Sequence, residues 1–268
     1  MFIYFLTAFF VFLLGLCIGS FLNCLIYRLE EEKTIKGRSF CPHCRHTLIW
    51  KDLLPVLSFL VLRGKCRYCK KKISFQYPAV EILTGLVFLL IFINQFSSQQ
   101  EILSISFSGI ARTSFLFYIT SSLIAIFVYD LKHFLIPDKI LFPATAVALL
   151  YRIAESPHLI GNYILAVLIG SAFFLSVFLI SKGQWIGFGD VKLAILLGLI
   201  LGFPKIILGL FLAFFFGAII GVIMMVFQKR GLKSEIPFGP FLIIGTAISF
   251  FWGSQMIDWY LGMLIFAP

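Results

Sequence analysis

Long apolar runs repeat along almost the whole chain, and they leave few options other than a helical membrane protein. A transmembrane helix needs about 20 mostly apolar residues. Runs close to that length predict an all-α polytopic membrane protein with about eight spans. The predicted spans cover residues 1–26, 79–95, 113–129, 139–153, 162–181, 190–204, 205–228 and 238–267. The composition, 60% apolar and 13% charged, excludes a soluble globular protein.

The stretch between the first two predicted spans is strongly basic. Residues 28–78 carry twelve of the 22 Lys and Arg residues against four acidic ones. Such an excess beside a span marks the cytoplasmic side. No basic residue precedes the first run, which predicts an uncleaved first span with its amino terminus outside. Topology and anionic lipid thus account for the net charge of +10, and nucleic acid is not an expected partner.

Threading the remaining spans from this start agrees with the positive-inside rule at most turns. The basic residues brought to the cytoplasmic side are Lys132, Lys139, Lys182, Lys192, Lys229, Arg230 and Lys233, whereas Arg112, Arg152 and Lys205 are exceptions. The same threading brings Asp130, at the end of the third span, and Asp190, at the start of the sixth, to the cytoplasmic face.

Two CxxC pairs in the basic stretch predict a metal site. Cys41 and Cys44 are separated by 21 residues from Cys66 and Cys69. Four thiolates from two such pairs form a closed tetrahedral zinc site, and the cytoplasm disfavours disulfides. The alternatives are redox-active pairs, unliganded thiols and substitution of a ligand by His43 or His46. A stretch this poor in apolar residues gains folding energy from a bound metal, which predicts a structural role for Zn²⁺.

These signals predict three parts of the chain. Residues 1–27 form the first transmembrane helix, and residues 28–78 form a cytoplasmic zinc-binding loop. Residues 79–268 form a transmembrane helical bundle. The lipid bilayer is the expected surrounding of the first and third parts, and nothing in the sequence indicates an oligomeric state.

Asp130 and Asp190 are the candidate catalytic residues because ionisable groups near a bilayer are costly and functional by default. Two adjacent carboxylates can share a proton, activate water and protonate a leaving amine, as peptide hydrolysis requires. Gly187 and Gly189 before Asp190 permit close approach of an extended peptide backbone. An aspartyl peptidase is therefore one function that these residues suit.

Other interpretations remain open at this level. Asp190 after two glycines also suits a helix cap, and Asp138 after Pro137 suits a helix start but rivals Asp130 as a catalytic residue. An ion-coupled transporter would use Asp130 and Asp190 to bind a cation or proton, but it predicts a broken-helix repeat that the sequence lacks. A zinc-bearing assembly factor without catalysis leaves the spacing of the aspartates unexplained.

Six motifs follow one another along nearly the whole chain. They are Gly15 with Gly19-Ser20-Phe21-Leu22-Asn23 and Tyr27-Arg28-Leu29, the two CxxC pairs, Tyr77-Pro78-Ala79-Val80-Glu81, Asp130 with Ile136-Pro137-Asp138, Gly187-Phe188-Gly189-Asp190-Val191-Lys192, and Ile236-Pro237-Phe238-Gly239-Pro240-Phe241. In this order they resemble the motifs of the type IV prepilin leader peptidases, which are membrane aspartyl proteases of the GxGD type.

The resemblance implies that Asp130 and Asp190 are the catalytic pair and that Gly187, Gly189 and Asp138 support them. It implies cleavage of prepilins and pseudopilins on the cytoplasmic face of a bacterial inner membrane. It also implies methylation of the new amino terminus by S-adenosylmethionine, an activity associated with the complete CxxC pairs of residues 28–78. Candidate contributors to the methyl-donor site are Asn23, Arg28 and Glu81.

Overall fold

The computed structural model describes residues 2–34, 37–96, 98–104, 106–228 and 237–265. Ile236, the first residue of the last motif, and the basic residues Lys229, Arg230 and Lys233 lie outside the described residues.

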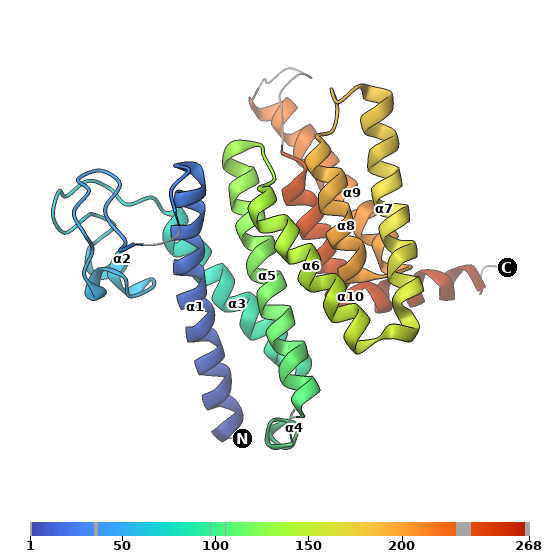
Figure 1. The fold of residues 1–268 in the computed structure, drawn as a ribbon, viewed down its shortest axis with the longest axis horizontal. Helices are drawn as coiled ribbons and strands as arrows, with labels where there is room; N and C mark the ends of the chain where they lie inside the picture. The colour runs from blue at the N-terminus through green and yellow to red at the C-terminus, as the bar shows by residue number, and fades with distance from the viewer. Residues whose placement is uncertain (1, 35–36, 97, 105, 229–236, 266–268) are drawn as a thin grey trace. The chain divides into compact units, whose positions relative to one another are not determined.

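Within these residues, eight long helices follow the eight predicted spans in order (Figure 1). Six of the described helices are long and apolar enough to cross a membrane, and α6 and α8 are the two shorter ones. The all-α polytopic membrane fold is therefore confirmed. The long helices are α1 (Phe2–Glu30), α3 (Gln76–Gln95), α5 (Phe107–His133), α6 (Asp138–Glu155), α7 (Ile160–Ser181), α8 (Phe188–Leu201), α9 (Lys205–Gln228) and α10 (Gly239–Ile265).

In the described parts of the connections lie four short helices, which have no counterpart among the predicted elements. They are η1 (Trp50–Asp52), α2 (Leu57–Val61), α4 (Gln99–Leu103) and η2 (Pro157–Leu159). Each is too short to give a periodic apolar pattern, which is the signal that identifies a helix in a sequence.

The chain forms two compact units, Met1–Ala125 and Ile126–Pro268, that divide inside α5. In the first unit α1 packs along α3. A Cβ atom on Gly15 would lie 2.7 Å from the Cα atom of Gly85, and one on Gly19 would lie 2.7 Å from the Cα atom of Glu81. Helices pack this closely in membranes only where small residues let their backbones meet. The opening motif is therefore part of the α1–α3 interface.

In the second unit α8 is the central helix, and α6, α7 and α10 pack against it. Ten of its 14 residues are buried. At 1.5 Å per residue α8 is about 21 Å long, shorter than the hydrocarbon core of a bilayer. It is thus enclosed by other helices along most of its length instead of facing lipid.

The carboxyl end of α8 explains one exception to the positive-inside rule. Arg152 donates from Nε to the carbonyl oxygen of Leu199 at 2.9 Å and from a terminal nitrogen to that of Ile200 at 2.8 Å. The guanidinium also lies 4.2 Å from the ring centroid of Tyr163. The last carbonyls of a helix have no partner within it. Arg152 therefore provides hydrogen-bond donors for the last carbonyl groups of a short, buried helix. The positive-inside rule does not consider this role.

Candidate functional site

Asp190 lies in the first turn of α8, where the glycine-rich motif ends the preceding connection. Its carboxylate accepts the backbone N–H of Gly187, the N-cap residue, and its own N–H donates to the carbonyl oxygen of Gly187 at 3.1 Å. The bond from the Gly187 N–H to the Asp190 carboxylate is one half of a capping box, and Gly187 has no side chain to form the other half. Asp190 is nevertheless buried, with only 7% of its surface exposed. The contact predicted for a cap is present, and it fixes an acidic side chain in the interior.

Asp130 lies in the last turn of α5 and is also buried, at 4% exposure. Its carboxylate accepts the backbone N–H of Gly239, the first residue of α10. A Cβ atom on Gly239 would lie 2.5 Å from Oδ2 of Asp130, closer than non-bonded atoms approach. The last motif of the sequence therefore contacts the first candidate catalytic residue through backbone.

The ends of α5, α8 and α10 meet in one site. Asp130 and Asp190 interact electrostatically. Ile136 packs against both Gly189, which precedes Asp190, and Gly239, which contacts Asp130. A Cβ atom on Gly189 would lie 3.2 Å from Cβ of Ile136, and one on Gly239 would lie 3.7 Å from its Cδ1 atom. Two buried carboxylates in one site can hold a shared proton and act on a water molecule as acid and base.

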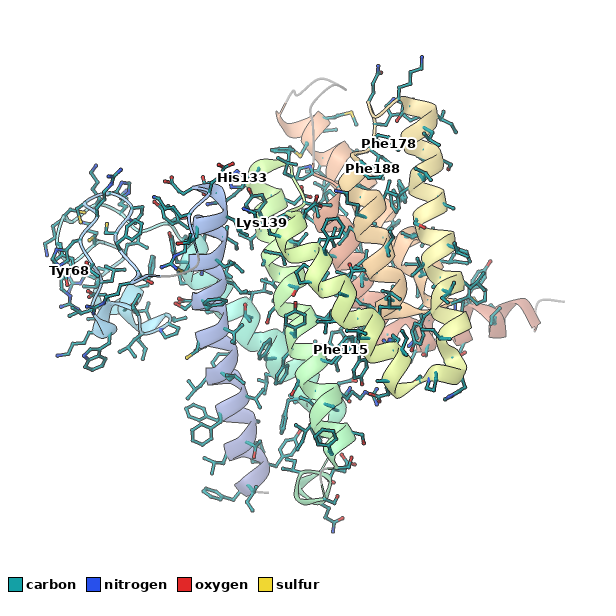
Figure 2. All side chains as sticks on the ribbon, viewed as in Figure 1. Tyr68, Phe115, His133, Lys139, Phe178 and Phe188 are labelled. Carbon is teal, nitrogen blue, oxygen red and sulfur yellow. The ribbon has the colours of Figure 1, made fainter. Side chains whose placement is uncertain are left out.

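The two glycines before Asp190 have different surroundings. Gly189 is restricted by Ile136, whereas a Cβ atom on Gly187 would find its nearest neighbour at 3.8 Å. Figure 2 shows Phe178, at the end of α7, and Phe188, at the start of α8, directed toward each other, with ring centroids 5.5 Å apart. The motif is thus held by packing on one side, and Gly187 has space for a side chain.

Asp138 occupies a different environment from the other two aspartates. It begins α6, and Nζ of Lys192 lies 2.9 and 2.8 Å from its two carboxylate oxygens. The Asp138 side chain is 48% exposed. The Lys192 ammonium also lies over the rings of Phe142 and Phe188, at 5.4 and 5.6 Å from their centroids. Asp138 therefore ties the start of α6 to the first turns of α8.

The four cysteines of residues 41–69 form one cluster, with all four Sγ atoms within 4.8 Å of one another. Sγ of Cys41 lies 4.0 Å from Sγ of Cys69. Tetrahedral zinc with Zn–S bonds of about 2.3 Å holds its sulfur atoms about 3.8 Å apart, so the cluster fits Zn²⁺. No other described group of three or more His, Cys, Asp or Glu residues was found in such an arrangement. The cysteine cluster predicted from the spacing is therefore present, and it could hold zinc.

The two CxxC pairs form equivalent turns. The N–H of Cys41 donates to the carbonyl oxygen of His46 at 3.0 Å, and the N–H of Cys66 donates to that of Lys71 at 2.8 Å. Isolated β-bridges follow the same pattern, at residues 40 and 47 and at residues 65 and 72. The His46 ring contacts the Tyr68 ring, with centroids 3.7 Å apart and a tilt of 34°, and this contact joins the two turns.

The thiols differ in how readily they ionise. Burial raises the pKa of Cys66, but the backbone N–H groups of Cys69 and Tyr68 oppose this and bring the pKa down to about 7. At Cys44 the backbone N–H of His46 lowers the pKa, but burial and the neighbouring thiols of Cys41 and Cys69 together outweigh it, and the pKa rises to about 11. Metal ligands must be thiolates, and a bound cation favours that state in all four residues.

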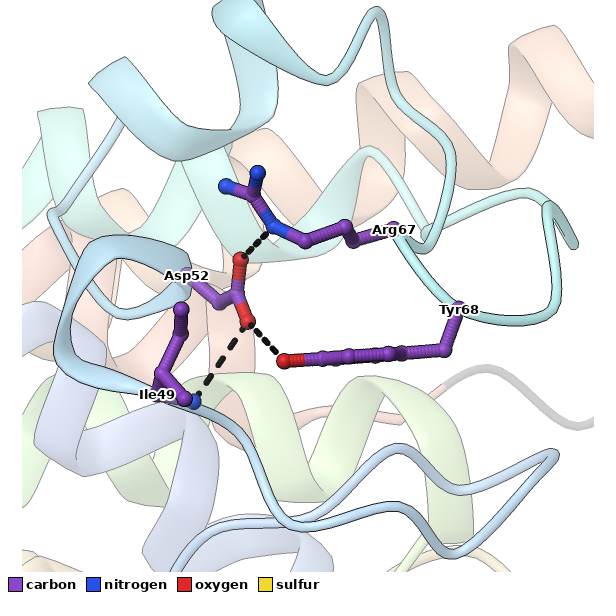
Figure 3. Close-up of polar contacts among 4 residues, drawn as sticks. All are labelled: Ile49, Asp52, Arg67 and Tyr68. Carbon is purple, nitrogen blue, oxygen red and sulfur yellow. Dashed lines mark hydrogen bonds and ion pairs between the residues drawn. The ribbon is translucent and has the colours of Figure 1, made fainter.

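Asp52 braces the second cysteine turn (Figure 3). Its carboxylate accepts three hydrogen bonds, from Nε of Arg67 at 2.7 Å, from the hydroxyl of Tyr68 at 3.2 Å and from the backbone N–H of Ile49 at 3.4 Å. Arg67 and Tyr68 stand between Cys66 and Cys69 in the sequence. The loop geometry is therefore supported by a carboxylate that neither spacing nor motif had indicated.

The three candidates for the methyl-donor site are buried where the loop meets α1 and α3. Asn23 donates to the carbonyl oxygens of Gly19 and Tyr77, at 3.2 and 3.0 Å. A terminal nitrogen of Arg28 donates to the carbonyl oxygen of Gly37 at 2.7 Å.

Glu81 accepts the N–H of Val56 at 2.7 Å. All three side chains, Asn23, Arg28 and Glu81, are less than 9% exposed and contact the protein's own backbone.

Most of the chain matches known protein families. Residues 13–95 match the bacterial peptidase A24 N-terminal domain, and residues 116–222 match the type IV leader peptidase family. A protein of Aeromonas hydrophila is 30% identical over 94% of this chain and 92% of its own length. One of Bacillus subtilis is 31% identical over 95% and 98%. Both are named prepilin leader peptidase/N-methyltransferase. No solved structure matches the chain.

Proposed function

Because the chain belongs to the type IV leader peptidase family, we propose that this membrane enzyme removes the leader from prepilins and pseudopilins and then N-methylates the new amino terminus. The observation that carries the peptidase part is the meeting of Asp130 and Asp190, both buried, at the ends of α5, α8 and α10. An ion-coupled transporter is not favoured, because the relatives are named as peptidases and methyltransferases.

Asp130 and Asp190 divide the chemistry of peptide hydrolysis between them. One carboxylate is ionised and removes a proton from water as the oxygen attacks the scissile carbonyl. The other is protonated and gives its proton to the departing amine. The amides of Gly239 and Gly187 hold the two carboxylates in place. Gly187, which has space around it, leaves the approach of a substrate backbone open.

The membrane topology proposed from the sequence fits this chemistry. The amino terminus lies outside, the loop of residues 28–78 and both aspartates face the cytoplasm, and the host membrane is the bacterial inner membrane. Support comes from the basic residues of the loop and from the position of the two aspartates at helix ends instead of helix centres. A prepilin inserted with its basic leader in the cytoplasm would meet the site there.

Cys41, Cys44, Cys66 and Cys69 would hold Zn²⁺ as a structural ion within the proposed loop of residues 28–78. S-adenosylmethionine would supply the methyl group. Asn23, Arg28 and Glu81 have groups suited to its carboxylate and hydroxyls, but they already bind the backbone of this chain, so they do not fit a set of direct ligands. We propose that they shape the methyl-donor site by holding the loop, and no step of transfer is routed through them.

Product mass tests the proposed function. The purified protein in detergent, incubated with a prepilin and S-adenosylmethionine, is expected to yield a pilin that has lost its leader and gained one methyl group. Leader loss without the methyl group would remove the transferase and keep the peptidase. An unchanged mass with several prepilins and pseudopilins would contradict both activities.

Replacement of Asp138 by asparagine should leave measurable cleavage activity. The Asp138–Lys192 pair is partly exposed, and such pairs contribute about 0.2–1 kcal/mol, which corresponds to at most about a fivefold change. Initial rates of leader removal measure the effect. A loss as complete as that of an Asp130 variant would instead make Asp138 a catalytic residue.

Loss of one cysteine of the cluster should remove the metal. Cys41→Ser and Cys69→Ser are expected to lower the zinc content of the purified protein and to reduce methylation, because a structural site needs all four ligands. Cys17→Ser, an exposed position on α1, is the matched control and should retain its zinc. Metal analysis that gave equal zinc in all of these proteins would contradict the metal site.

A further inference from the structure

A short segment between the two cysteine turns has an unusually apolar surface. It comprises residues 50–61, with η1 and α2, and is called here the η1–α2 segment. Trp50 is 68% exposed, Leu60 63% and Val61 77%. Leu53, Leu54 and Leu57 are exposed as well. Six large apolar side chains open to solvent within twelve residues mark an interaction surface.

The η1–α2 segment is hydrogen-bonded to one of the membrane-spanning helices, α3. The N–H of Val56 donates to Oε2 of Glu81 at 2.7 Å, and the hydroxyl of Ser20 donates to the same carboxylate. Glu81 lies one turn inside α3, and Ser20 lies inside the apolar run of α1. Val56 is therefore held beside the start of the apolar run of α3 and beside the carboxyl-terminal part of the apolar run of α1.

The backbone at Val56 supports this attachment. Val56 has a φ of +59°, a conformation that a β-branched residue adopts only under constraint. Such strain persists where surrounding contacts determine it. The bond to Glu81 is a contact of that kind, so the η1–α2 segment is held against α3 at this point.

The charges of the segment complement a lipid surface. Asp52 is its single acidic residue, and its side chain is only 3% exposed because Arg67, Tyr68 and the N–H of Ile49 bind the carboxylate (Figure 3). Lys51, inside the segment, is exposed, as are Arg63 and Lys65 directly after it. The surface is thus apolar with a basic margin, the composition typical of elements that lie in a membrane interface.

We propose that the η1–α2 segment is an interfacial membrane anchor. Its apolar side chains lie among the headgroups and upper acyl chains of the bilayer that α1 and α3 cross, and Lys51, Arg63 and Lys65 bind anionic lipid headgroups. The anchor fixes the middle of the loop to the membrane, while the two cysteine turns on either side of it stay in water. This inference does not depend on the proposed catalytic activities.

Fluorescence of Trp50 tests the anchor in the full-length protein. Trp185, Trp252 and Trp259 are replaced by phenylalanine, and the protein is reconstituted in nanodiscs of phosphatidylcholine with phosphatidylglycerol. Lipids brominated near the top of the acyl chains should quench most of the Trp50 emission, and aqueous iodide should quench little. Omission of phosphatidylglycerol should weaken the bromolipid quenching, because the basic margin then has no anionic partner.

The matched control moves the tryptophan to the other side of the loop. Figure 2 shows Tyr68 on the side of the loop away from α1, and the His46 ring contacts the Tyr68 ring. In a protein with Trp50→Phe and His46→Trp, iodide should quench strongly and bromolipid weakly. If the substituted proteins do not fold, hydroxyl-radical footprinting of the native protein in nanodiscs replaces them. Leu57, Leu60 and Val61 should then be labelled far less than Tyr68.

Three results would overturn the anchor. Iodide could reach Trp50 freely in nanodiscs while bromolipid leaves it unchanged. Protection of Trp50 could require added prepilin, which would make the surface a substrate site. Protection could instead rise with the number of protein copies in each nanodisc, which would make it an interface between two copies of the chain.

Discussion

Replacing either Asp130 or Asp190 by asparagine is expected to abolish leader removal. Asparagine has nearly the same shape as aspartate, and its carbonyl oxygen can still accept the N–H of Gly239 or Gly187. The change therefore removes the exchangeable proton and the charge while keeping the packing. A positioned acid or base contributes about 10²–10⁴-fold to a rate, so initial cleavage rates should fall by about 10³-fold or more.

The double variant sharpens this prediction. If the two carboxylates work as one unit, Asp130→Asn with Asp190→Asn should be no slower than either single variant, because residues of one catalytic unit are not additive. Asp258→Asn, an exposed position on α10, is the matched control and should cleave at the normal rate. Moderate losses in the single variants that add up in the double variant would indicate that the aspartates are structural caps.

A second substrate separates catalysis from folding. A pilin that already has a free amino terminus needs no cleavage, so both aspartate variants should still methylate it if the methyl-donor site depends on the loop with α1 and α3. Retained methylation would demonstrate an intact protein. Loss of both activities in every variant would point to misfolding, and the conclusion about the aspartates would then rest on the controls alone.

The sequence predicted the long helices because their apolar runs are a local property of the chain. It also predicted the cysteine cluster from four residues and their spacing. What it missed depends on contacts between distant residues. Asp52 had no motif around it, and its role follows from where Arg67 and Tyr68 lie in the fold. Arg152 is an exception to the positive-inside rule, and the structure explains it by the bonds to the last carbonyl groups of α8.

The site itself was predictable only in part. Asp190 carried two interpretations, helix cap and catalytic acid, and the structure has the cap contact in a buried position where either role is possible. Asp138 could not be distinguished from Asp130 by sequence spacing. The difference lies in Lys192, which is 54 residues away from Asp138 and pairs with it. The signal that could have identified Gly239 was its position between two prolines at the start of the last apolar run.

Replacing Gly239 by alanine is expected to cost about as much activity as a displaced catalytic group, roughly 10²-fold. The added methyl group would lie 2.5 Å from Oδ2 of Asp130, so either the carboxylate or the start of α10 must move. Either movement lengthens the hydrogen bond from the Gly239 N–H to the Asp130 carboxylate, and this bond orients Asp130. Because substrate contacts need not change, the loss should appear in kcat of leader removal.

Gly262→Ala is the matched control for this last prediction. Gly262 belongs to the same helix, α10, and a Cβ atom there would meet nothing within 4 Å. The same chemical change should therefore leave kcat unaltered at this position, even though alanine favours the helix equally in both proteins. Equal rates for the two alanine variants would mean that Asp130 tolerates displacement, and that the contact with Gly239 does not position it for catalysis.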